Sequence, residues 1–99
     1  MTQQEIQDYW DQKAETLKTD PAATMKDVLL RSMEIEAIGS RLKAGDELID
    51  VGGGNAFAGI QWAEHCRHVT VVDYSQKMIA AARDAISASS RHNLSLIHI

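Results

Sequence analysis

The sequence predicts an α/β fold with a parallel sheet, because two patterns alternate along it. Over residues 46–99, short apolar runs alternate with longer stretches of helical periodicity. The runs at 47–51, 68–73 and 94–99 have the length and composition of buried strands. Strands that alternate with helices form βαβ units. We therefore expect the N-terminal portion of a doubly wound parallel sheet, preceded by two helices in residues 1–45.

The first of these two helices is expected over residues 3–18. Thr2 and Glu5 have the spacing of a capping box, which satisfies free backbone donors at the start of a helix. One face of the helix carries Ile6, Tyr9, Trp10, Ala14 and Leu17, with Lys13 as its polar member. Side chains at this spacing indicate a packed face. Tyr9 and Trp10 are interpreted either as core residues or as an aromatic lid over a ligand.

The second helix is expected over residues 25–43, after a break at residues 20–21 where proline displaces the preceding residue from the helical region. Thr24 and Asp27 open it. Its apolar face consists of Met25, Val28, Leu29, Ile35, Ile38 and Leu42, widened by Leu30, Met33 and Ala37. Arg31 interrupts this face. It is interpreted either as solvent-facing or as ligand-facing, because arginine suits bidentate binding of a carboxylate.

Two further helices connect the strands of the βαβαβ unit. They are expected over residues 56–66 and 76–88, with Asn55 and Ser75 as their N-caps. The third strand would leave an apolar edge of the sheet bare, which natural proteins avoid. We therefore expect these residues to be the front part of a longer, truncated domain. The 99-residue chain alone is expected to fold poorly and to have no catalytic activity.

Composition narrows the classes of partner. The formal net charge of −4 and the lack of a basic stripe argue against a nucleic-acid groove. A single cysteine, Cys66, excludes an internal disulfide and fits a reducing compartment. No apolar run approaches the ~18 residues that a membrane span needs. We therefore expect a cytoplasmic protein without a membrane or nucleic-acid partner.

The residues that follow the first two strands indicate the class of ligand. Parallel strands bring their carboxyl ends to one edge of the sheet, where ligands bind. Gly52, Gly53 and Gly54 allow the backbone to turn and to approach a ligand closely. Asp73 lies 21 residues after Gly52, where a carboxylate can accept hydrogen bonds from both hydroxyls of an adenosine ribose. The spacing therefore predicts a nucleoside cofactor.

The positions of the glycines discriminate between nucleoside cofactors. A dinucleotide fingerprint that starts at Gly52 requires a third glycine where Phe57 stands. This disfavours an NAD(P)-dependent oxidoreductase, which stays as the alternative. An acid-x-G-x-G-x-G pattern fits better, because Asp50, Gly52 and Gly54 match it and Ala56 departs from the last glycine by one methyl group.

Residues 48–56, LIDVGGGNA, and residues 71–79, VVDYSQKMI, together resemble the first two cofactor motifs of class I S-adenosylmethionine-dependent methyltransferases, which have a Rossmann-like fold. The likeness covers residues 47–83, and the preceding helices resemble the variable N-terminal region of the small-molecule branch. The resemblance implies S-adenosylmethionine as the cofactor and methyl transfer to an unidentified small-molecule acceptor. It also implies that the N-terminal helices act as a lid or cap over the cofactor.

By the same resemblance, the first motif holds the methionyl part of the cofactor. Asp50 and the backbone of Gly52 and Gly54 would contact it, with Gly53 in the same loop. Arg31 is a candidate partner for the cofactor carboxylate.

The second motif, by resemblance, holds the adenosine. Asp73 would accept the ribose hydroxyls, and Tyr74 and Met78 would pack near the adenine.

Two residues of the first motif depart from the family. Gly53 stands where cysteine is frequent, which adds backbone freedom. Ala56 replaces the third glycine, which puts a methyl group near the cofactor.

Other interpretations stay open. A glycine cluster can be a tight turn, and an acid at a strand end can be a helix cap. The chain can also be a non-catalytic, Rossmann-like remnant. His65, Cys66 and His68 straddle a helix end and a strand start without a further cysteine cluster, so no metal site is expected. The sequence assigns neither a catalytic base nor an oligomeric state.

Overall fold

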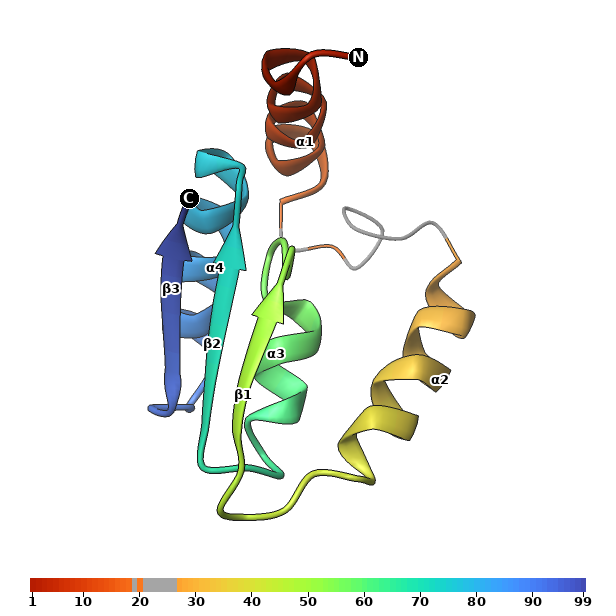
Figure 1. The fold of residues 1–99 in the computed structure, drawn as a ribbon, viewed down its shortest axis with the longest axis vertical. Coiled ribbons are helices and arrows are strands. Elements are labelled where there is room, and N and C mark those ends of the chain that lie inside the picture. The colour runs from red at the N-terminus through yellow and green to blue at the C-terminus, as the bar shows by residue number, and fades with distance from the viewer. Residues whose placement is uncertain (19, 21–26) are drawn as a thin grey trace.

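The computed structural model describes residues 1–18, 20 and 27–99 of the chain. Its elements follow in the order α1 (Gln3–Leu17), α2 (Val28–Gly39), β1 (Glu47–Val51), α3 (Phe57–Trp62), β2 (His68–Asp73), α4 (Gln76–Ala88) and β3 (Leu94–His98) (Figure 1). The predicted α/β class and the alternation of strands and helices are confirmed. Within the described residues, no helix is long and apolar enough to cross a lipid bilayer.

The three strands form one parallel sheet in the order β1-β2-β3. The register pairs Val51 with Val72 and Asp73 with His98, so the carboxyl ends of the strands lie at one edge. Val69 and Val71 of β2 are fully buried at the centre of the core. Helices α3 and α4 both pack on this side of the sheet, behind the strands in Figure 1.

The opposite face of the sheet carries exposed apolar side chains. Successive side chains of a strand point to opposite faces. Ile49 and Val51 of β1 are therefore directed away from α3, and their exposed fractions are 65% and 75%. Ile97 of β3 is 47% exposed. These exposed fractions show that no described helix covers the three residues, so the described part supplies one of the two helical layers of a doubly wound sheet.

Side-chain caps begin three of the helices as predicted. Thr2, Asp27 and Ser75 each accept a hydrogen bond from the backbone N–H three residues later, at distances of 2.9 to 3.1 Å. These bonds satisfy donors that a helix start leaves free. They fix the first residues of α1, α2 and α4, and α4 has the predicted bounds of 76–88.

Helix α2 differs from its predicted bounds of 25–43. It ends at Gly39, where a Cβ would lie 3.3 Å from His65 Cδ2, so the His65 ring packs against the backbone of the helix end. The predicted opening at Thr24 and Met25 and the proline break lie outside the described residues. Most of the predicted apolar face is 39% to 73% exposed: Val28, Leu29, Leu30, Met33 and Ile38. The helix packs on α3 rather than on the sheet, so one stripe around Ile35 is covered.

Helix α3 ends at Trp62, whereas residues 56–66 were expected to be helical. The physical reason lies in the loop before β3. The side-chain amide of Asn93 donates to the backbone carbonyls of Ala63 and Cys66 at 2.9 and 3.2 Å. These bonds satisfy carbonyls that a helix end leaves free, so the chain can turn into β2 early.

Candidate functional site

The glycine loop, which we define as residues 52–56, connects β1 to α3 and lies beside the carboxyl end of β2. The backbone N–H groups of Gly52 and Gly53 both donate to the carbonyl of Val72, at 2.7 and 3.2 Å. These bonds continue the pairing of the two strands beyond the end of β1. They place the loop beside the segment that follows β2, namely residues 73–75, which we call the aspartate turn.

The Asp73 carboxylate connects the two segments. Its Oδ2 accepts from the backbone N–H of Gly54 at 2.8 Å, and its Oδ1 accepts from the N–H of Ser75 at 2.9 Å. The residue is 9% exposed. Because each carboxylate oxygen has more than one acceptor site, both oxygens keep capacity for a ligand donor. A charged acceptor is therefore held rigidly at the edge of the sheet.

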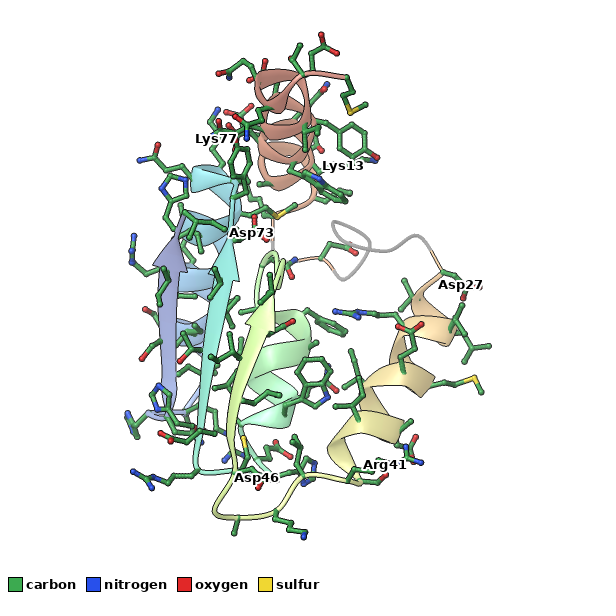
Figure 2. All side chains as sticks on the ribbon, viewed as in Figure 1. Lys13, Asp27, Arg41, Asp46, Asp73 and Lys77 are labelled. Carbon is green, nitrogen blue, oxygen red and sulfur yellow. The ribbon has the colours of Figure 1, made fainter. Side chains whose placement is uncertain are left out.

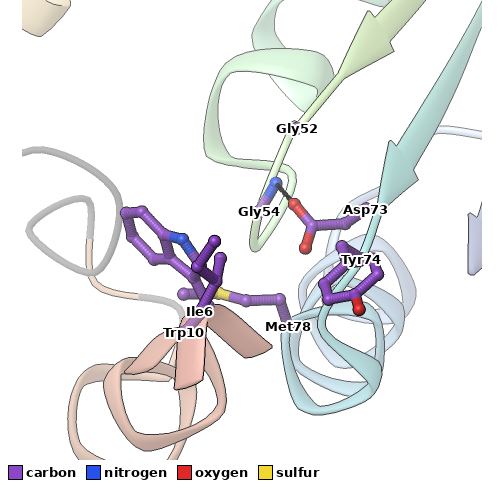
Figure 3. Close-up of a pocket in the computed structure, with 7 residues that line it drawn as sticks. All are labelled: Ile6, Trp10, Gly52, Gly54, Asp73, Tyr74 and Met78. Carbon is purple, nitrogen blue, oxygen red and sulfur yellow. Dashed lines mark hydrogen bonds between the residues drawn. The ribbon is translucent and has the colours of Figure 1, made fainter. Parts of the chain in front are cut away.

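A cavity of about 260 Å³ opens in front of Asp73 (Figure 3). Its walls are Ile6, Trp10, Gly52, Gly54, Asp73, Tyr74 and Met78. Five of these residues belong to the site predicted from the sequence, and the structure brings them together. Ile6 of α1 was absent from that prediction, and Trp10 was named only as part of a possible aromatic lid. Their spacing of four residues on one helix face was the available signal.

Of the two aromatic side chains of α1, Trp10 lines the cavity and Tyr9 does not. Tyr9 is 47% exposed, and its ring lies edge-on to Trp10 with centroids 5.0 Å apart. The interpretation of the aromatic pair as a lid therefore fits Trp10 alone.

Gly53 lies behind the cavity wall, and space explains why it is a glycine. A Cβ at this position would lie 2.5 Å from Val71 Cγ1 and 2.7 Å from Asp50 Oδ2. Its φ angle is not positive, unlike those of Gly52 at 75° and Gly54 at 60°. The expectation that Gly53 adds backbone freedom is therefore corrected. Close packing of the loop on β2 requires a residue without a side chain.

Ala56 adopts the left-handed conformation that glycine favours, with φ at 66°. Its exposed fraction is 0%, and its methyl group packs in the core. The methyl group does not line the cavity, and its place near the cofactor stays a prediction. Ala56 is also the N-cap residue of α3, a place predicted for Asn55. Asn55 still accepts a hydrogen bond from the N–H of Phe57 at 3.2 Å.

Asp50 and Arg31 lie outside the cavity wall, and each has a buried polar atom without a partner. Within the part of the chain that the structure describes, neither Asp50 Oδ2 nor Arg31 Nε makes a hydrogen bond. Burial raises the pKa of Asp50 above its ordinary 3.8, whereas the Arg31 charge lowers it and the Asp73 charge raises it. Arg31 Nη1 lies 3.6 Å from a carboxylate oxygen of Glu34. A carboxylate oxygen and a guanidinium nitrogen that both lack hydrogen bonds among the described residues are suited to a zwitterionic ligand.

His65, Cys66 and His68 do not converge on one point. The Cys66 thiol donates to the carbonyls of Trp62 and His68, and burial raises its pKa. The His68 ring is instead hydrogen-bonded to Ser95 Oγ at 2.8 Å. Cys66 and His68 therefore make contacts that hold the start of β2 in place.

Comparison with known proteins gives matches in fold. No family model matches the chain, and no curated protein matches its sequence. Phosphoethanolamine N-methyltransferase 1 from Haemonchus contortus, solved with phosphoethanolamine and S-adenosylhomocysteine, matches with a TM-score of 0.73 and 20% identity, over 100% of this chain and 22% of that one. This chain has the fold of the N-terminal part of a class I S-adenosylmethionine-dependent methyltransferase.

Two further methyltransferase structures agree. An S-adenosylmethionine-dependent methyltransferase from Thiobacillus denitrificans, solved with S-adenosylhomocysteine, has a TM-score of 0.54 and 25% identity over 68% of this chain and 29% of that one. An rRNA methylase from Streptococcus thermophilus has a TM-score of 0.61 and 18% identity over 66% and 39%. The chain thus spans 22% to 39% of the length of these three methyltransferases.

Proposed function

We propose that this chain binds S-adenosylmethionine at the carboxyl ends of β1 and β2 and serves methyl transfer to a small-molecule acceptor. One observation carries the proposal: the Asp73 carboxylate lies at the edge of a cavity, and Asp50 Oδ2, at the end of β1 just before the glycine loop, has no hydrogen-bond partner among the described residues. The same is true of Arg31 Nε on α2, whose charge acts on Asp50. Together these groups match the ribose, ammonium and carboxylate of the cofactor in charge and hydrogen-bonding type.

The adenosine half would lie in the cavity. Asp73 can accept the two ribose hydroxyls with the acceptor capacity that its backbone bonds leave. Trp10, Tyr74 and Met78 offer an apolar, partly aromatic wall of the kind that a purine ring needs. The walls come from α1 and from the start of α4, so both elements would close on the adenosine.

The methionyl half would extend toward Asp50 and Arg31. An ammonium group near Asp50 would compensate the buried charge whose desolvation raises the pKa of that carboxyl. The Arg31 guanidinium would receive the carboxylate of the cofactor. The residues present therefore fit the group, since each of these two side chains would meet an opposite charge.

When bound, the sulfonium of the cofactor supplies an electrophilic methyl group. The protein then has to hold the donor rigidly and keep it aligned with the acceptor. The hydrogen bonds that Asp73 accepts from the glycine loop and from the aspartate turn provide that rigidity. Ile6 and Trp10 would shield the adenosine half of the cofactor from water. No residue of the chain is assigned as a general base.

A small molecule is favoured as the acceptor for two reasons. The match to the Haemonchus contortus enzyme, solved with phosphoethanolamine, extends over the N-terminal helices, whereas the match to the rRNA methylase covers 66% of the chain. The net charge of −4 also disfavours RNA. The NAD(P) alternative is disfavoured because Phe57 packs against the core at the position of the third glycine.

Calorimetric titration tests the proposal. S-adenosylhomocysteine should bind and NADH should not compete with it. Asp73→Ala should weaken the affinity by about 100-fold, because hydrogen bonds to a charged acceptor contribute about 1.5–3 kcal/mol each. Ser75→Ala serves as the comparison: it removes the bond to Asp11 but keeps the Asp73 carboxylate, so it should weaken the affinity by only about tenfold. Equal affinity of Asp73→Ala and wild type would remove the ribose assignment, and competition by NADH would favour the oxidoreductase.

A further inference from the structure

Helix α1 carries Ile6 and Trp10 into the cavity, and two polar connections hold it there. The first involves Asn55 of the glycine loop, which is 1% exposed. Its side-chain amide donates to the backbone carbonyls of Lys18 and Asp20, at 2.8 and 2.9 Å. Both carbonyls follow the last turn of α1. The glycine loop thus fixes the C-terminal end of this helix.

The second connection involves Asp11 and the aspartate turn. Asp11 Oδ1 accepts a hydrogen bond from the hydroxyl of Ser75, which is fully buried, and lies 3.4 Å from the backbone N of Lys77, which also donates to it. The Lys77 side chain points toward α1 and pairs with Glu15 (Figure 2). The Asp11 carboxylate therefore sits at the start of α4, where a helix favours negative charge.

These connections set the position of Trp10. Apolar packing of α1 is limited, because Ala14 is the one fully covered residue that the structure describes in this helix. Trp10 is the neighbour of Asp11 in sequence, and its ring contributes to a small cluster around Met78. A helix that is held at its middle by the aspartate turn and at its end by the glycine loop can neither slide nor rotate freely.

We propose that Asn55 and Asp11 are positioning residues that hold Trp10 over the cofactor cavity, so that docking of α1 and binding of the cofactor stabilise each other. The inference rests on the proposed function. It adds that the glycine loop and the aspartate turn each act on the ligand in two ways. Each contacts the ligand directly, and each also holds α1, which contacts the ligand in turn. Because coupling between two equilibria is reciprocal, the cofactor must protect α1 as strongly as α1 promotes cofactor binding.

The variants that test this remove one connection each. Asn55→Asp loses the two donors to α1 but keeps the oxygen that accepts from Phe57. Asp11→Ala loses the bond to Ser75, and Asp11→Asn restores an acceptor there. Asp8→Ala is the matched control, because Asp8 is an exposed aspartate of the same helix whose carboxylate accepts from Gln4.

The measurements are calorimetric affinity for S-adenosylhomocysteine, hydrogen exchange of α1 and β2, and the fluorescence of Trp10, assigned by comparison with Trp10→Phe. Wild-type protein should show slower exchange in α1 and quenched Trp10 emission when the ligand is bound. Asn55→Asp and Asp11→Ala should bind about tenfold more weakly. They should also expose α1 to exchange with β2 unchanged, and lose the quenching even at saturating ligand. Asp11→Asn and Asp8→Ala should resemble wild type.

The outcomes separate the two proposals. If wild-type protein binds S-adenosylhomocysteine and both variants keep its affinity and the Trp10 quenching, the positioning roles are overturned and the proposed function stands. If the variants lose affinity but still quench Trp10 fully at saturation, the residues act on stability alone and the positioning roles are again overturned. Absence of binding to the wild-type chain would overturn the proposed function and the coupling together.

Discussion

The glycine loop and the aspartate turn border the same cavity, but they are shaped by different forces. At two positions of the loop, steric fit and backbone conformation constrain the residue: Gly53 has no space for a Cβ, and Ala56 occupies a left-handed conformation. In the turn, hydrogen bonds decide, since Asp73 and Ser75 bind backbone N–H groups and other side chains. A larger side chain at a closely packed position has no space, whereas a segment held by several hydrogen bonds loses stability gradually as single bonds are removed. The two segments should therefore respond differently to substitution.

The largest effect is expected for Gly53→Ala. The added methyl group would need to displace Val71 and the Asp50 carboxylate, and overpacking of this kind should destabilise the fold by about 3 kcal/mol. Gly45→Ala is the matched control, because nothing lies within 4 Å of the place that its Cβ would take, and it should change stability by less than about 0.5 kcal/mol. Urea unfolding measures both. Similar values for the two variants would contradict the steric account of the loop.

Ser75→Ala should have an intermediate effect on the turn. It removes the N-cap bond to Met78 and the bond to Asp11, so we expect a loss of about 1.5 kcal/mol in urea unfolding. Ser87→Ala, at an exposed serine of the same helix, should be close to neutral. A loss as large as that of Gly53→Ala would show that the turn is as intolerant as the loop.

Asp50 and Asp73 extend the comparison to two carboxylates. Both oxygens of Asp73 accept hydrogen bonds, whereas the buried Oδ2 of Asp50 has no partner among the described residues. The folded-state pKa of Asp50 is raised, so its ionised form opposes folding above that pKa, and this cost disappears as the pH falls toward the ordinary value of 3.8. Asp50→Asn should therefore stabilise the ligand-free protein near neutral pH, by an amount that shrinks on acidification. It should also weaken S-adenosylhomocysteine binding. Thermal unfolding across this pH range would refute the account if the variant is less stable at neutral pH.

The smallest effect is expected for Ala56→Gly. Relief of the left-handed conformation is worth about 1–2 kcal/mol, and it is offset by the loss of a buried methyl group and by the greater freedom of glycine in the unfolded chain. The net change in unfolding free energy should stay within about 1 kcal/mol. Ala58→Gly is the matched control inside α3 and should destabilise by about 2 kcal/mol. Equal losses would show that the Ala56 methyl outweighs the backbone strain.

Local patterns predicted most of the fold. The strands at 47–51 and 68–73 and the helix at 76–88 have the predicted bounds, because a β-branched run or a capping serine marks them in the sequence. The site also followed from spacing, in that Gly52, Gly54 and Asp73 meet at one cavity. These features depend on neighbours in sequence and on the general geometry of parallel sheets.

Features that depend on distant partners were not predictable. The periodicity of α2 indicates an apolar face but not that α3 covers a single stripe of it. The early end of α3 depends on Asn93, a residue 30 positions after Ala63. The bonds from Asn55 to Lys18 and from Ser75 to Asp11 likewise join segments with no pattern in common. In each case a polar side chain finds a backbone or carboxylate partner that periodicity does not record.

The exposed apolar side chains of the sheet should affect two properties of this chain, its solubility in salt solutions and its binding of a fluorescent dye. Ile49, Val51 and Ile97 form an apolar strip opposite α3 and α4. Sulfate and phosphate strengthen the burial of such surface, so solubility should fall steeply as these salts are added. We expect the same strip to bind the dye ANS in the native state, although ANS fluorescence is commonly used to detect loosely packed states. Bright ANS emission from this chain would therefore report an ordered sheet surface, with the core behind it intact.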